Sequence, residues 1–135
     1  PGANTAATFD ALLAACKANG MVAMISPILS WEPASDELAW SWYERTDIYN
    51  VLMKYKDHTI LDGVMEQNYS DRTRWETTAK TAIDKLRAKG YTQTINCMSS
   101  DYGRSAATII EKSAAVFNHD PLKNVMFNVQ SYWST

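Results

Sequence analysis

The stretch His58–Tyr69, HTILDGVMEQNY, decides the fold that this sequence predicts. It opens with an apolar run, Thr59–Met65, that has the length of a single β-strand. The run ends on the carboxylate of Glu66, and a short polar loop separates it from a helical pattern that begins near Thr73. Parallel α/β sheets present their ligand-binding residues in such loops, at the carboxyl ends of the strands. Glu66 is therefore the first candidate for a catalytic residue, and a loop glutamate exposed to water is the alternative.

The rest of the chain repeats this strand-then-helix unit. Apolar runs of strand length fall at residues 21–26, 58–65, 91–97 and 125–130. Helical spacing of apolar residues predicts helices over residues 6–18, 35–56, 73–89 and 105–117. The strands are short and do not alternate between apolar and polar residues, which is typical of a parallel sheet. We expect one α/β domain, residues 1–135, with four parallel strands in sequential order and outer helices.

The loops that follow these strands gather on one rim of the sheet, because the carboxyl ends of parallel strands all face the same way. Aromatic rings stack on the apolar faces of sugars, whereas amides and carboxylates bind hydroxyl groups, so the rim suits a carbohydrate better than a phosphate. No GxGxxG or Walker pattern is present. Beside Glu66, the predicted substrate-binding residues are Trp31, Asn68, Tyr69, Asp101, Tyr102, Gln130, Tyr132 and Trp133. The alternative is that these aromatic rings pack the mouths of the strands, as we expect Trp40, Trp42 and Trp75 to pack within helices.

Composition excludes several classes of function. The chain of 135 residues has a net charge of −2 and no basic block, which argues against nucleic-acid binding. No apolar run approaches the ~20 residues of a membrane span, and the sequence shows no signal peptide. The two cysteines, Cys16 and Cys97, are expected to be buried free thiols, with a disulfide as the alternative. His58 and His119 are isolated, so we expect no metal site and no cofactor.

Three stretches of the chain resemble bacterial β-mannanases of glycoside hydrolase family 5. Residues 116–134, VFNHDPLKNVMFNVQSYWS, are similar to the segment that ends at strand six of those enzymes. Residues 83–95, IDKLRAKGYTQTI, resemble their helix four and strand five, and residues 18–25, ANGMVAMI, resemble strand three. The resemblance implies a (β/α)8 barrel of which this chain supplies about strands three to six, a half-barrel unit.

The family resemblance also implies a reaction, the retaining hydrolysis of a β-linked polysaccharide outside the cell. Two glutamates carry out this reaction, an acid/base on strand four and a nucleophile on strand seven, about 5–5.5 Å apart. Glu66 falls on the acid/base position, whereas strands one, two, seven and eight, and with them the nucleophile, have no counterpart in these residues. Pro1 in place of an initiator methionine suggests a processed form, an expression product or a piece of something longer.

Several positions depart from the family pattern. The asparagine that precedes the acid is Met65, the His-Asp pair after strand three falls on Ile28 and Leu29, and the strand-six histidine falls on Gln130. The aromatic residue after strand five is kept in kind as Tyr102. These changes favour a glycosidase-like domain that has lost most of its catalytic site and acts as a structural, interaction or carbohydrate-binding subunit. The alternative is a fragment of an active β-mannanase or cellulase-type enzyme with Glu66 as the acid/base.

A half barrel has two open sheet edges and an uncovered concave face. We therefore expect self-association or incorporation into a larger assembly. Inner-face residues such as Met24, Val64 and Ile95 should then be buried partly by another chain.

Overall fold

The computed structural model describes residues 5–27 and 35–131, in which helices and strands alternate along the chain. The strands are β1 (Ala23–Ile25), β2 (Thr59–Val64), β3 (Thr94–Met98) and β4 (Val125–Asn128). The helices are α1 (Ala6–Ala18), α2 (Ser35–Glu44), α3 (Thr46–Lys54), α4 (Arg72–Lys89) and α5 (Ala106–His119), with a 3-10 turn η1 (Lys56–His58). All strand pairs are parallel and the order is β1-β2-β3-β4, so the predicted sheet is confirmed.

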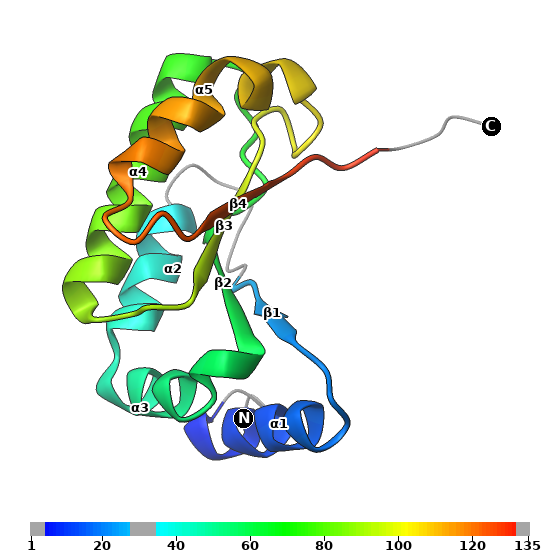
Figure 1. Ribbon diagram of the computed structural model, residues 1–135, viewed down its shortest axis with the longest axis vertical. Coiled ribbons are helices and arrows are strands. Elements are labelled where there is room, and N and C mark those ends of the chain that lie inside the picture. The colour runs from blue at the N-terminus through cyan, green and yellow to red at the C-terminus, as the bar shows by residue number, and fades with distance from the viewer. Residues whose placement is uncertain (1–4, 28–34, 132–135) are drawn as a thin grey trace.

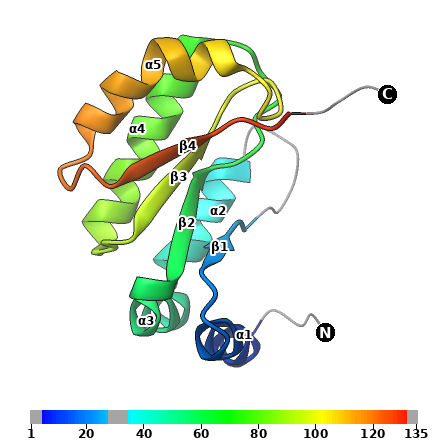
Figure 2. The same ribbon diagram turned by 45° about the vertical axis from the view of Figure 1, so that its right-hand side comes forward.

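Helices α2, α4 and α5 lie along one face of the sheet, and no helix of the described residues covers the other face. Figure 1 shows these three helices on the left of the strands and α1 and α3 below the sheet, and Figure 2 shows the same arrangement from a second direction. A curved parallel sheet with helices only on its outer side is the arrangement of one half of a (β/α)8 barrel. The predicted fold class is therefore confirmed.

Two tryptophans connect α4 and α2 to the sheet through hydrogen bonds. Trp75 of α4 is fully buried and its indole Nε1–H donates to the carbonyl of Met98, at 2.7 Å. Trp40 of α2 is also buried and donates to the carbonyl of Gly63, at 2.9 Å. A buried indole needs such a partner for its N–H, so the packing role predicted for these residues is confirmed.

The predicted helix over residues 35–56 is wrong, because the structure has two helices there. Arg45 adopts an extended backbone conformation, with φ −60° and ψ 132°, and separates α2 from α3. The carboxylate of Asp47 accepts hydrogen bonds from the Ile48 amide and from the Arg45 guanidinium, which stabilises the start of the second helix. Apolar periodicity runs through the break because both helices bury apolar side chains in the same core cluster, among them Trp40, Ile48 and Leu52.

The predicted burial of Val64 and Ile95 by another chain is wrong. Both side chains are fully buried within this chain, in the cluster that α4 forms with the sheet. Ile95 lies on the helical side, since its Cγ2 would be 2.7 Å from a Cβ added to Gly63. Met24, in contrast, is 47% exposed. Strands this short contain no pattern that tells one face from the other, because both faces carry apolar residues.

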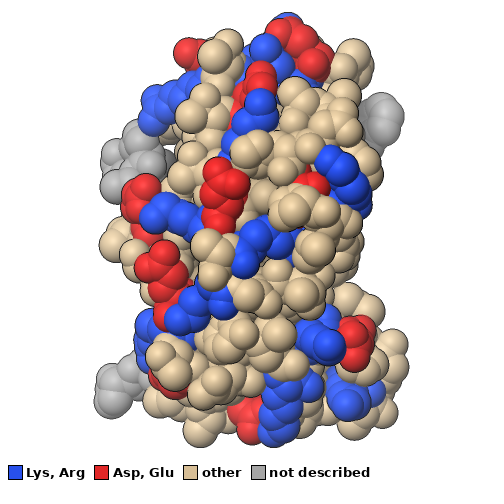
Figure 3. Space-filling view, turned by 60° about the vertical axis from the view of Figure 1, so that its left-hand side comes forward, with Lys and Arg blue, Asp and Glu red and all other residues tan. Residues whose placement is uncertain are grey.

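The helical face carries both signs of charge, intermingled (Figure 3). Ion pairs link neighbouring helices across this face, among them Arg72–Glu111 and Lys112–Glu76, which join α4 to α5. On the face that Figure 3 shows, Lys and Arg side chains alternate with Asp and Glu and form no continuous basic patch.

Candidate functional site

Backbone hydrogen bonds tie the loops after β2, β3 and β4 into one rim at the carboxyl edge of the sheet. The amide of Asp101 donates to the carbonyl of Tyr69 at 2.8 Å, and that of Tyr102 to the carbonyl of Gln67 at 2.6 Å. The amide of Gln130 donates to the carbonyl of Gly103 at 2.7 Å. Three loops that are distant in the sequence therefore form a single surface, which we call the rim.

Glu66 and Gln130 meet on this rim. The Gln130 side-chain amide donates to Oε1 of Glu66 at 2.6 Å and also lies 3.4 Å from the sulfur of Met98. Glu66 itself is half-buried. An amide can orient this carboxylate but cannot exchange a proton with it, as an imidazole could.

A left-handed turn presents Tyr102 on the rim. Asp101, Tyr102 and Gly103 have φ values of 56°, 55° and 77°, a conformation that costs energy for residues other than glycine. Tyr102 is 42% exposed, and the guanidinium of Arg104 lies 5.4 Å from its ring centroid. Arg104 also pairs with the carboxylate of Asp101 at 3.1 Å. The turn therefore presents the Tyr102 ring to solvent. The Asp101 carboxylate, the second one predicted on the rim, is occupied by its ion pair with Arg104.

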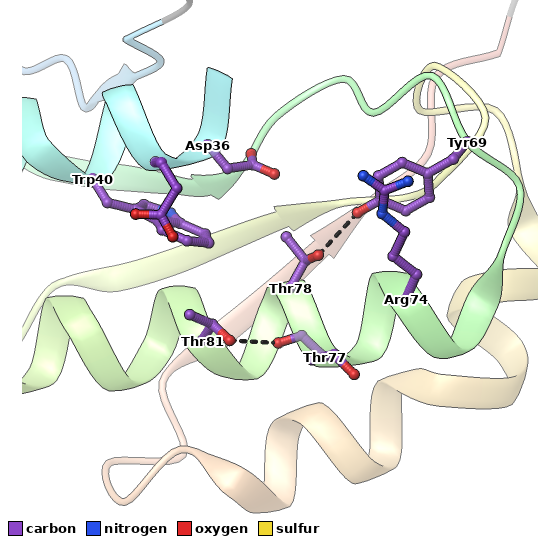
Figure 4. Close-up of a pocket in the computed structure, with 8 residues that line it drawn as sticks. Asp36, Trp40, Tyr69, Arg74, Thr77, Thr78 and Thr81 are labelled. Carbon is purple, nitrogen blue, oxygen red and sulfur yellow. Dashed lines mark hydrogen bonds between the residues drawn. The ribbon is translucent and has the colours of Figure 1, made fainter. Parts of the chain in front are cut away.

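Tyr69 points away from the rim and lines a separate cavity between α2 and α4 (Figure 4). Its hydroxyl lies 3.0 Å from that of Thr78, and the Arg74 guanidinium lies 4.1 Å from its ring centroid. Burial raises the pKa of Tyr69. In this structure Tyr69 therefore lies with the cavity residues and not beside Glu66 and Tyr102.

The other predicted rim residues contribute less to the described geometry. Asn68 is exposed on the loop after β2. Trp31, Tyr132 and Trp133, and the substituted positions Ile28 and Leu29, lie outside the described residues.

Asp36 is a buried carboxylate beside the rim that sequence reasoning missed. It accepts a hydrogen bond from the Gln67 side-chain amide at 2.7 Å. Burial raises its pKa to about 7, although a hydrogen bond from the Met65 amide and the charge of Arg74 oppose the rise. An acid in the first turn of a helix usually faces water, so the sequence contained no signal for this contact.

A second buried polar cluster crosses the middle of the sheet. Asp62 of β2 accepts hydrogen bonds from the Ser26 hydroxyl and from the side-chain amide of Asn96 in β3. Burial raises the pKa of Asp62, and these two hydrogen bonds oppose that rise. The Oδ1 of Asn96 is buried without a hydrogen-bond partner among the described residues. An aspartate within an apolar run was the one signal in the sequence that could have indicated this cluster.

The described residues show no group of three metal-ligating side chains. Within residues 5–27 and 35–131, no helix is long and apolar enough to cross a membrane.

Comparison with known proteins agrees with the fold. The family model for cellulases, glycosyl hydrolase family 5, matches residues 1–135, and the chain belongs to this family. It is 31% identical over 88 residues to a mannan endo-1,4-beta-mannosidase of Cellvibrio japonicus (strain Ueda107), over 63% of this chain and 20% of that protein. It is 32% identical over 79 residues to one of Salipaludibacillus agaradhaerens, over 57% of this chain and 26% of that protein.

Solved structures show the same fold. The mannohexaose complex of the Thermomonospora fusca β-mannanase superposes with a TM-score of 0.81 at 21% identity, covering 96% of this chain and 46% of that one. The catalytic domain of a mannanase from Streptomyces sp. SirexAA-E gives 0.79 at 21% identity, covering 92% and 41%. The chain thus spans less than half the length of the relatives and structures that it matches, and the predicted similarity to part of a β-mannanase barrel is confirmed.

Proposed function

We propose that this chain is a glycosidase-like domain that binds a β-1,4-mannan oligosaccharide on its rim without hydrolysing it. The observation that carries the proposal is the contact between Glu66 and Gln130. The carboxylate is held by an amide, and the exposed ring of Tyr102 stands on the same rim. Carboxylate, amide and aromatic ring are together the groups that bind sugar hydroxyls and stack on sugar faces. The names of the relatives, which are mannan endo-1,4-beta-mannosidases, support mannan as the polysaccharide.

Two features of the rim support the proposed absence of hydrolysis. Retaining hydrolysis needs a proton donor and a nucleophile about 5–5.5 Å apart. Asp101, the other predicted rim carboxylate, is paired with Arg104. Met65 is buried, so it offers the sugar neither a hydrogen bond nor a surface. These features support binding over turnover, and an extracellular location is proposed from the family resemblance alone.

The test pairs binding with turnover on the same sample. Mannohexaose is titrated into the chain by calorimetry, and reducing ends are measured after long incubation. We expect binding that weakens at least about tenfold in Tyr102→Ala, the loss of roughly 1.4 kcal/mol, and no reducing ends. Turnover that disappears in Glu66→Gln would overturn the proposal in favour of an active glycosidase with Glu66 as its acid. Absence of both binding and turnover would leave only a structural role.

We also propose that the single domain of residues 1–135 associates through its open concave face, by self-association or in a larger assembly. Met24 is 47% exposed on β1, a strand at the edge of the sheet. Light scattering checks this, because a monomer that stays monodisperse at all concentrations contradicts self-association.

A further inference from the structure

A polar cavity lies between α2 and α4, on the helical side of the sheet and apart from Glu66 and Tyr102. Its volume is about 230 Å³. Two helices and the loop after β2 supply the lining residues Asp36, Glu37, Trp40, Tyr69, Arg74, Thr77, Thr78 and Thr81. Figure 4 shows Asp36 pointing into the space between α2 and the pair formed by Tyr69 and Arg74. Ligand pockets usually measure about 300–1,000 Å³, so this cavity accommodates one small ring and not an extended chain.

The lining combines several hydrogen-bond acceptors with the donors of one guanidinium group, that of Arg74. The hydroxyls of Thr77 and Thr81 donate to helix carbonyls one turn earlier, at 3.1 and 2.9 Å, which leaves their oxygens as acceptors. Asp36 presents a carboxyl group whose Oδ1 is held by Gln67. Arg74 stacks on Tyr69 and forms no ion pair with any carboxylate in the described part of the chain. Its guanidinium therefore retains donors for a ligand.

The charges around the cavity nearly cancel. Asp36, Glu37 and Arg74 all line the cavity, and Lys85 adds a second positive charge beside it, 3.5 Å from Glu37 and 5.6 Å from the Trp40 ring centroid. A balanced set of charges does not favour an anion or a cation. Carboxylate oxygens and a guanidinium side by side instead match the neighbouring hydroxyls of a polyol, which both accept and donate.

From this lining we infer that the cavity binds a single neutral hexose unit, as a free sugar or the end of a chain, at a site distinct from the rim. The site goes beyond the proposed function, because Glu66, Tyr102 and Gln130 take no part in it. Two residues of the loop after β2, Gln67 and Tyr69, connect it to the rim. The side chain of Gln67 binds Asp36, and its carbonyl accepts the amide of Tyr102. A sugar on Asp36 would therefore alter the loop that presents Tyr102.

The experiment titrates mannose, glucose and galactose separately into the chain labelled with nitrogen-15. The indole N–H of Trp40 reports on the cavity, and the backbone amide of Tyr102 reports on the rim. We expect saturable shifts at Trp40 with at least one hexose. Arg74→Gln and Thr81→Val, which remove a donor fork and an acceptor, should each weaken this binding about tenfold, the effect of roughly 1.4 kcal/mol.

Two control variants separate the cavity from the rim. Thr73→Val alters an exposed threonine of the same helix that does not line the cavity, and Tyr102→Ala removes the ring of the rim. Neither should change the hexose titration at Trp40. The inference is overturned if no hexose gives a saturable shift at Trp40, or if Tyr102→Ala abolishes the shift while Arg74→Gln and Thr81→Val leave it intact. Loss of mannohexaose binding at the rim alone would contradict the proposed function and leave the cavity site standing.

Discussion

Arg87 and Asp120 form a two-pronged ion pair at the amino ends of β3 and β4. Nε donates to Oδ1 at 2.9 Å and Nη2 to Oδ2 at 2.8 Å. The remaining guanidinium donors reach the carbonyls of Tyr91, Gln93 and Asn124. Asp120 also accepts hydrogen bonds from the backbone amides of Leu122 and Asn124. The DPLKN run that carries the family resemblance is therefore a structural junction, in which Asp120 joins α4 to the turn before β4.

Removal of one member of this pair should destabilise the fold strongly. The Asp120 side chain is fully buried and that of Arg87 is 8% exposed. Asp120→Ala leaves a buried guanidinium unpaired, which costs about 3–5 kcal/mol of unfolding free energy. Glu111→Ala is the matched control, since its pair with Arg72 is about half exposed and should cost less than about 1 kcal/mol. Urea unfolding measures both, and equal costs would contradict the structural role of Asp120.

Asp36 should make stability depend on pH. Its folded pKa of about 7 exceeds the unfolded value of about 3.9, so the folded chain holds a proton that the unfolded chain releases. The unfolding free energy should therefore fall as pH rises from about 4 to about 7, and the contribution of Asp36 should be constant above that range. Asp36→Asn should remove the contribution of Asp36 to this decrease in unfolding free energy. Urea unfolding across the range tests it, and identical pH profiles for both proteins would refute the assignment.

Gly63 should be intolerant of a side chain. A Cβ at this position would lie 2.7 Å from Cγ2 of Ile95 and 3.4 Å from Cβ of Ala82, because α4 packs closely on β2. Gly63→Ala should cost about 1–3 kcal/mol by overpacking. The double variant with Ile95→Ala should lose less than the sum of the single variants, because it removes the obstructing methyl group. Strict additivity in thermal or urea unfolding would contradict this contact.

A side chain at Gly103 should disturb the rim by steric contact as well as by backbone strain. A Cβ there would lie 2.9 Å from the sulfur of Met98 and 3.2 Å from Cγ of Gln130, at a φ of +77°. Gly103→Ala should therefore displace Gln130 from Glu66 and weaken mannohexaose binding several-fold. Gly20→Ala is the control, since Gly20 has a φ of +67° but no atom within 4 Å of the added Cβ. It carries the same type of strain, and calorimetry should find its affinity unchanged.

The sequence by itself determined the four strands, their order and their parallel pairing. Apolar runs such as Thr59–Met65 predict strands, and the helical spacing of apolar residues between them predicts helices. Both patterns depend only on residues that are close in the sequence. The meeting of the loops on one rim followed as well, because it is a property of every parallel sheet.

Tertiary structure alone decided which side chains meet. Tyr69 was expected beside Glu66, yet its hydroxyl pairs with Thr78 and its ring with Arg74 in the cavity behind the sheet. Asp36 reaches Gln67 although 31 residues separate them. The break at Arg45 likewise interrupts an apolar period that continues on both sides. The physical reason is common to all three: a side chain's direction depends on the backbone path and packing of distant segments, which local spacing does not encode.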